Sequence, residues 1–173
     1  GGGADPTQRA KVNTMVVNGI VVVASNGNDG PTATTGDPGR AAHVITVSAV
    51  NDVNALASYA SRGYTGLEPD VDDKPDVVAP GGSQHRSKIL SVDSNTGDTG
   101  DGSLPDAAPD DYASVMGTSM AAPFVAGAAA LLAGALERAG APWSFDSSAS
   151  PHLVKALLLA SATELGRARE SGS

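Results

Sequence analysis

The chain has 173 residues, of which 40% are hydrophobic and only 3% aromatic, and its formal net charge is -8 at pH 7. This length fits one domain or part of one, and an acidic surface repels phosphate, which argues against nucleic-acid binding. The chain has no cysteine, which excludes disulfides and thiolate metal sites.

The first predicted elements are a capped helix and a buried strand. In "ADPTQRAKVNTMVVNG", Asp5 can cap the helix, Pro6 suits its first position and Gly19 supplies the stop. The β-branched run "IVVVAS" then predicts a strand over 20–25 that is buried on both faces. A helix followed by a buried strand indicates a crossover unit in an α/β fold with a mostly parallel sheet.

Two more strands are predicted from His43 to Val50 and from Lys74 to Gly81, with an edge segment over 55–63 between them. From Ser94 to Asp111 the chain consists mostly of Asp, Gly, Ser, Thr and Pro, which is typical of a long surface loop with poor order.

Two helices follow. The run from Ser119 to about Arg138 is apolar all round, which predicts a centrally buried helix. Its uniformly apolar part is shorter than the ~20 residues that a membrane span needs, so a core helix is the better interpretation. "SPHLVKALLLASA" predicts a second helix, capped by Ser150, with Leu153, Leu157 and Ala160 on one apolar face.

Two polar residues stand where chemistry is expected. Ser119 lies at a helix N-terminus, whose N–H groups and dipole favour developing negative charge, although a simple cap by Thr118 or Ser119 is the commoner use of such residues. Asn28 follows the strand over 20–25, at the edge where open α/β sheets build their sites, and its amide can donate to an oxyanion. The surrounding "NGNDG" is also an ordinary turn signal.

The chain resembles the subtilisin-like serine proteases (subtilases) over nearly its whole length. The motifs that match, in family order, are "GIVVVASNGNDG", "DPGRAAHVITVSAV", "KPDVVAPG" and "GTSMAAPFVAG". The resemblance implies a three-layer α/β subtilisin-like fold, with residues 1–173 as the C-terminal portion of the catalytic domain and an acidic loop insertion at about 83–112. It also implies a serine endopeptidase in which Ser119 is the nucleophile and Asn28, with the Ser119 N–H, forms the oxyanion hole.

The resemblance implies a polypeptide substrate, which would pair with the cleft walls as an added strand. The candidate residues for these walls and for the pocket floor are Gly1, Gly2, Ser25, Asn26, Gly27 and Gly36. The family is typically secreted, and no membrane or nucleic-acid partner is expected.

No cofactor is expected to be required, but the resemblance leaves room for a structural calcium at Asp76 with the carbonyls near Gly39 and Ala41. The stretch "DSNTGDTGDG" resembles a calcium loop only in composition, because Asp98 stands where an EF-hand loop needs glycine.

The family's aspartate and histidine motifs, D-T-G or D-S-G and H-G-T-x-V-A-G, have no counterpart upstream of Asn28. "DTGDG" at Asp98 lies in the wrong place in chain order, and none of the three histidines, His43, His85 and His152, stands in a motif that positions a base. The expectation is therefore that the triad Asp and His lie outside this chain, in the N-terminal portion of its own domain, and that the isolated chain is inactive.

Two alternatives remain open. One is a non-catalytic, subtilase-like protein that binds peptides or serves as a scaffold, which retention of both Ser119 and Asn28 disfavours. The other is a sedolisin-type acid peptidase, which uses a protonated aspartate in the oxyanion hole, whereas Asn28 favours the subtilisin branch.

Overall fold

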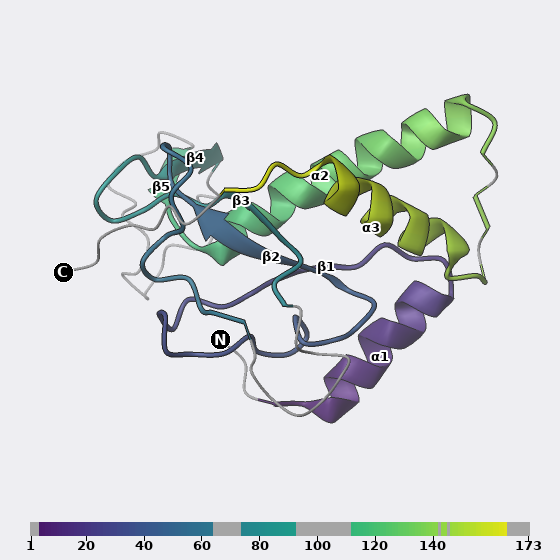
Figure 1. The fold of residues 1–173 in the computed structure, drawn as a ribbon, viewed down its shortest axis with the longest axis horizontal. Helices are drawn as coiled ribbons and strands as arrows, with labels where there is room; N and C mark the ends of the chain where they lie inside the picture. The colour runs from purple at the N-terminus through teal and green to yellow at the C-terminus, as the bar shows by residue number, and fades with distance from the viewer. Residues whose placement is uncertain (1–3, 64–73, 93–111, 142, 145, 166–173) are drawn as a thin grey trace.

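The computed structural model describes residues 4–63, 74–92, 112–141, 143–144 and 146–165 (Figure 1). The elements run in the order α1 (Pro6–Val17), β1 (Val23–Ser25), β2 (Ile45–Val50), β3 (Val77–Pro80), β4 (Ile89–Val92), β5 (Tyr112–Val115), α2 (Thr118–Arg138) and α3 (Ala149–Ser161). The predicted helices and the three predicted strands are all present, although β1 is shorter than the predicted 20–25.

The main sheet has the order β1-β2-β3, and both pairs of strands are parallel. β2 lies in the middle and all six of its residues are buried, as expected for a central parallel strand covered on both faces. β4 and β5 form a separate antiparallel pair that the sequence analysis did not predict. They flank residues 93–111, so the loop predicted over 94–111 lies outside the described residues.

Side chains of β2 form the larger core with α2. Ile45, Val47 and Ala49 are buried on one face of the sheet, where Ala121 and Val125 of α2 pack with them. Their spacing of two residues is what a strand requires to direct side chains to a single face. This core holds the first turns of α2 against the sheet.

A smaller core covers the opposite face. Val23 packs with the larger core, whereas the next residue, Ala24, is buried with Val44 and with Val12 of α1. Successive residues of a strand point to opposite faces, so α1 and α2 cover different sides of the sheet. Figure 1 shows this arrangement, with α1 below the sheet and α2 and α3 above it. The three-layer α/β architecture is thereby confirmed.

The predicted start of α1 is confirmed in detail. Asp5 is the N-cap, and its carboxylate accepts hydrogen bonds from the backbone N–H groups of Thr7 at 3.0 Å and Gln8 at 3.1 Å. Gly19, just past the helix, has a φ of 83°, which a side chain rarely tolerates. The cap and the stop are local features and depend only on neighbouring residues.

The prediction that α2 is buried all round is wrong for the described chain. Its buried residues form one stripe that faces the sheet, Thr118, Ala121, Val125 and Ala129. Phe124 is 50% exposed and Leu131 is 76% exposed, because the described elements cover only this stripe. By length and composition α2 would also suit a membrane span, but the core helices of soluble proteins pass the same test, so a single such helix is weak evidence.

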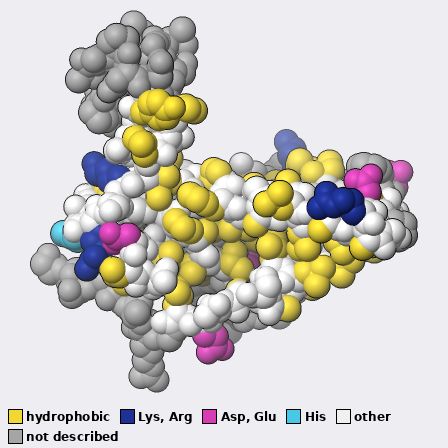
Figure 2. Space-filling view, turned by 90° about the horizontal axis from the view of Figure 1, so that it is seen from above, with side chains coloured by type: hydrophobic (Ala, Val, Ile, Leu, Met, Phe, Trp, Pro, Cys, Tyr) yellow, Lys and Arg dark blue, Asp and Glu magenta, His cyan; other side chains and the backbone are white. Residues whose placement is uncertain are grey.

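The prediction for α3 is wrong in its cap and in its buried face. Ser148, not Ser150, is the N-cap, and the buried side of the helix carries Val154, while Leu153 and Leu157 are exposed. The helix carries apolar residues on more than one of its own sides, so their spacing in the sequence cannot show which side meets the sheet. Seen from the side of α2 and α3, apolar side chains lie along much of the surface (Figure 2).

Candidate active site

Ser119 is the second residue of α2 and is exposed to solvent. The N-cap of this helix is Gly117, and no side chain caps it, so the interpretation of Thr118 or Ser119 as a simple cap is wrong. Ser119 thus lies in the first turn of α2, where the positive end of the helix dipole favours a developing negative charge beside its hydroxyl.

Asn28 lies beside this helix start, and its orientation is set by Thr118. The Asn28 Oδ1 atom accepts hydrogen bonds from the Thr118 N–H at 2.9 Å and the Thr118 hydroxyl at 2.8 Å. A backbone N–H only donates, so the atom that faces it must be the amide oxygen. The Nδ2 donor is therefore the other end of the amide, and it lies 3.3 Å from where a Cβ on Gly117 would stand.

Thr118 belongs to the candidate site, although the sequence analysis considered it only as a cap. It is completely buried, and its hydroxyl also accepts a hydrogen bond from the Gly27 N–H at 3.2 Å. The hydroxyl thus links the segment that carries Asn28 to the residue that precedes Ser119. The sequence offered one signal for this role, a threonine directly before Ser119. Nothing in the neighbouring residues indicated that its partner is Asn28, 90 positions away.

The predicted cleft wall leads directly to Asn28. Ser25 ends β1 and is half-buried, whereas Asn26 is 1% exposed. The Asn26 amide donates to the Ser61 carbonyl and accepts from the Thr35 hydroxyl at 2.5 Å. The Asn26 side chain is therefore committed to the interior, so that Asn26 can face a substrate only with its backbone groups.

The other predicted cleft residues are placed in part. Gly36 is half-buried and follows Thr35, whose hydroxyl contacts Asn26, so the expected pocket floor lies next to the expected wall. Gly1 and Gly2 lie outside the described residues.

A cavity of about 390 Å³ opens beside Ser119, between the β4–β5 pair and the first turns of α2. Its polar side chains are those of Ser91 and Ser119, and its other lining side chains are apolar, among them Val92, Val115 and Phe124. This arrangement suits an apolar group held next to the Ser119 hydroxyl.

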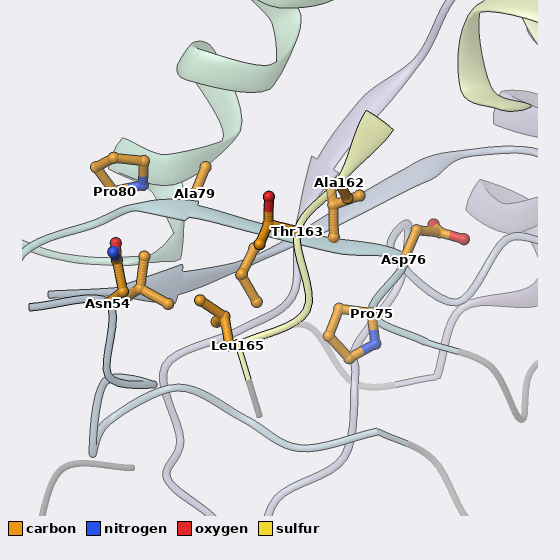
Figure 3. A pocket seen from close by; sticks show the side chains of 11 residues that line it. Asn54, Pro75, Asp76, Ala79, Pro80, Ala162, Thr163 and Leu165 are labelled. Atoms are coloured by element: carbon orange, nitrogen blue, oxygen red, sulfur yellow. The ribbon is translucent and has the colours of Figure 1, made fainter. Parts of the chain in front are cut away.

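A second cavity, of about 420 Å³, lies along β3 and the segment after α3 (Figure 3). It contains neither Ser119 nor Asn28, and its lining is mostly apolar, with Leu165 and Pro75 among the labelled side chains. Its one ionisable lining residue is Asp76, whose carboxylate is paired with lysines. Of these two cavities, only the one beside Ser119 would place a ligand next to the candidate nucleophile.

His43 and His152 lie away from the serine. His43 precedes the amino end of β2, whereas Asn28 follows the carboxyl end of β1 in the same parallel sheet. Its Nδ1 atom is 3.1 Å from Nε2 of His152, and burial lowers the pKa of His152, with further lowering by His43 and Lys155. The Asp98 motif lies outside the described residues.

His85 is exposed in the segment before β4, where its backbone N–H donates to the Ser83 hydroxyl. In the part of the chain that the structure describes, none of the three histidines is hydrogen-bonded to Ser119.

The groups expected at a structural calcium are engaged by the protein itself. The Asp76 carboxylate accepts from the Lys74 ammonium at 2.6 Å, the Thr46 N–H at 2.7 Å and the Lys155 ammonium at 2.9 Å. The Gly39 carbonyl accepts from the Thr46 hydroxyl at 2.5 Å and the Ala41 carbonyl from the Val44 N–H at 3.2 Å. These residues therefore do not fit a calcium ion.

The two ammonium groups of this cluster also share the Val44 carbonyl, which accepts from Lys74 at 2.6 Å and from Lys155 at 2.9 Å. Burial, together with the neighbouring Lys155 and against the attraction of Asp76, lowers the pKa of Lys74 from 10.5 to about 8. Among the described residues, no group of three or more His, Asp or Glu side chains is placed to hold a metal ion.

Comparison with known proteins agrees with this geometry. The whole chain, residues 1–173, matches the family model described as the subtilase family. It is 39% identical over 132 residues to an extracellular protease of Xanthomonas campestris, which covers 76% of this chain and 19% of that protein. It is 38% identical over 124 residues to a subtilisin of Bacillus pumilus, covering 70% of this chain and 35% of the subtilisin.

The fold is similar to those of solved proteases of this type. A protease of Pseudoalteromonas arctica aligns with a TM-score of 0.70 and 29% identity, over 98% of this chain and 44% of that one. A cold-adapted subtilisin-like serine proteinase aligns with a TM-score of 0.64 at 23% identity, which supports the fold alone. The chain thus spans less than half of the length of these relatives.

Proposed function

The chain belongs to the subtilase family, and on that basis we propose that it supplies the nucleophile and the oxyanion hole of a serine endopeptidase. The observation that supports this most directly is the double hydrogen bond from Thr118 to Asn28 Oδ1, which turns the amide donor of Asn28 away from Thr118. A donor that is fixed before the reaction stabilises the transition state without reorganising during it.

In the proposed mechanism the Ser119 Oγ attacks the carbonyl carbon of a peptide bond, and its proton passes to a base. The carbonyl oxygen becomes an oxyanion that accepts hydrogen bonds from Asn28 Nδ2 and the Ser119 N–H. Collapse of this intermediate breaks the C–N bond, and the base returns the proton to the leaving amine. Water then hydrolyses the acyl-enzyme by the same route and regenerates Ser119.

The base in this proposal is a histidine, oriented by an aspartate, that lies outside these 173 residues. The relatives, which are longer than the chain, leave room for it, and His43 and His152 are paired with each other instead. In subtilisin, loss of the histidine lowers kcat by about 10⁶-fold. The isolated chain is accordingly expected to have almost no turnover.

The proposed substrate is an extended segment of polypeptide. Its backbone would pair with the segment from Ser25 to Gly27, since the Asn26 side chain points inward. We also propose that the protein is secreted, since one relative is named an extracellular protease.

Labelling with a fluorophosphonate probe tests this function. We expect Ser119 to be labelled when the chain is joined to the segment that precedes it in its gene, and far more slowly without that segment. Ser119→Ala should abolish labelling, whereas the matched control Ser161→Ala, at the exposed end of α3, should not change it. Equal labelling with and without the preceding segment would contradict the proposal.

The preceding sequence also separates this function from the two alternatives. A non-catalytic peptide-binding protein would lack the aspartate and histidine there and would bind peptides without labelling. A sedolisin-type enzyme would show its highest rate at strongly acidic pH, whereas an oxyanion hole built on a neutral amide predicts activity near neutral pH.

A further inference from the structure

We propose that Tyr59 is a positioning residue that holds the Asn28 segment and the Ser119 segment in register, so that both donors of the oxyanion hole meet one oxygen. This inference rests on the proposed function. Tyr59 follows β2 in the chain and belongs to neither segment, but its backbone contacts the Asn28 segment and its hydroxyl contacts the turn at Gly81, to which Gly117 is hydrogen-bonded.

The ring of Tyr59 is anchored in the larger core. It is half-buried and packs against the cluster that contains Ala49 and Ala79 of the sheet and Ala121 of α2. A ring held by such packing has little freedom, so its hydroxyl is a fixed point from which a hydrogen bond can position a neighbouring backbone.

The hydroxyl of Tyr59 holds the turn that contacts the start of α2. It lies 2.9 Å from the carbonyl oxygens of Gly81 and Gly82, and its single proton is shared between these two acceptors. The Gly81 carbonyl also accepts a hydrogen bond from the Gly117 N–H at 2.9 Å. The hydroxyl is therefore one hydrogen-bonded step from the residue that caps α2.

The backbone of the same residue holds the other segment. The Tyr59 carbonyl accepts a hydrogen bond from the Gly30 N–H at 2.8 Å, two residues after Asn28. Nearby, the Ser61 N–H donates to the Gly27 carbonyl at 3.0 Å, and the Ser61 hydroxyl accepts from the Asp29 N–H at 3.1 Å. Residues 59–61 thus hold the Asn28 segment from both sides of the asparagine.

The turn at Gly81 packs tightly against Gly117 and Tyr59, so it has little room to move. A Cβ on Gly81 would lie 2.8 Å from the Gly117 carbonyl oxygen and 3.0 Å from the Tyr59 hydroxyl. A shift of the turn at Gly81 would therefore move Gly117, and with it the Ser119 N–H, relative to Asn28. Oxyanion donors act only at about 2.7–3.1 Å, so a displacement of a few tenths of an ångström weakens them.

Tyr59→Phe tests the inference in the intact protein, because it removes the hydroxyl and keeps the ring. We expect kcat for a peptide substrate to fall by about 2- to 10-fold with little change in KM, as expected for a transition-state contact weakened by about one hydrogen bond. The matched control is Tyr112→Phe, an exposed tyrosine on β5, which should leave kcat unchanged.

A double-mutant cycle with Asn28→Ala separates positioning from general destabilisation. If Tyr59 acts through the oxyanion hole, Tyr59→Phe should lose most of its effect on kcat once the Asn28 donor is gone. An undiminished effect in that background, or a lowered melting temperature with unchanged kcat, would overturn the inference. Activity that survives Ser119→Ala would instead refute the proposed function.

A measurement that needs no activity completes the test. Tyr59→Phe removes the hydroxyl that holds the Gly81 carbonyl, which is the acceptor of the Gly117 N–H. Amide hydrogen exchange should therefore become faster at Gly117 and stay unchanged at Val47 in the centre of β2. Unaltered exchange at Gly117 would show that the hydroxyl does not hold this turn, and the inference would then be wrong.

Discussion

Replacing Thr118 with valine removes the two hydrogen bonds that its hydroxyl makes beside the proposed oxyanion hole and leaves its backbone contact in place. Valine has nearly the shape of threonine, so it fills the same fully buried space. The Thr118 N–H still donates to Asn28 Oδ1, but the hydroxyl bond of 2.8 Å to the same atom is lost, as is the acceptor for the Gly27 N–H. The Asn28 amide is then held by one hydrogen bond instead of two.

The size of the effect follows from these contacts. A net hydrogen bond contributes about 1 kcal/mol, and an unsatisfied buried donor such as the Gly27 N–H costs about 1–3 kcal/mol. We therefore expect the free energy of unfolding to fall by about 1–3 kcal/mol. We expect kcat to fall by about 3- to 10-fold, well short of the 10²–10³ known for loss of the oxyanion-hole asparagine in subtilisin, about 3–4 kcal/mol.

The assay is steady-state hydrolysis of a peptide substrate by the intact protein, with kcat and KM determined separately. Thr118→Ser restores the hydroxyl and should recover most of kcat, which a role in packing alone would not predict. Thr14→Val, an exposed hydroxyl on α1, serves as the control. A Thr118→Val variant that loses stability but keeps its full kcat would refute the argument that the hydroxyl orients Asn28.

Three further predictions concern backbone and charge. Gly117→Ala should lower kcat and stability, because its Cβ would stand 3.3 Å from Asn28 Nδ2 at a φ of 153°, whereas Gly127→Ala, with open space at its Cβ, should keep kcat. Between pH about 8 and 10.5, Lys74 holds its proton in the unfolded chain but has lost it in the folded one, so the free energy of unfolding should rise with pH. The urea midpoint of the unmodified protein should show this rise, and that of Lys74→Met should not. Asp76→Asn leaves two ammonium groups without their carboxylate and should lower the unfolding free energy by about 3–5 kcal/mol; a loss below about 1 kcal/mol would contradict the pairing.

The sequence by itself determined the features that depend on neighbouring residues. The Asp5 cap, the stop at Gly19 and the buried run that forms β2 follow from local side-chain chemistry, and the structure has all three. The motifs around Asn28 and Ser119 likewise indicate the family from the order of residues alone, without any contact between the two segments. Short-range hydrogen bonds and the period of apolar residues carry this information because both repeat within a few positions of the chain.

Only the tertiary structure decided which groups meet. The orientation of the Asn28 amide depends on Thr118, 90 residues away in the sequence. No local pattern in either segment indicates that these two residues meet. The buried side of α3 was also decided by packing, because the helix has apolar residues on more than one side. Only contact with the rest of the fold makes Val154 buried and leaves Leu153 exposed. At Asp76 the fold brought Lys155 to a carboxylate expected to bind calcium. In each case the physical reason is the same: such contacts follow from how the layers stack, which is a property of the whole chain.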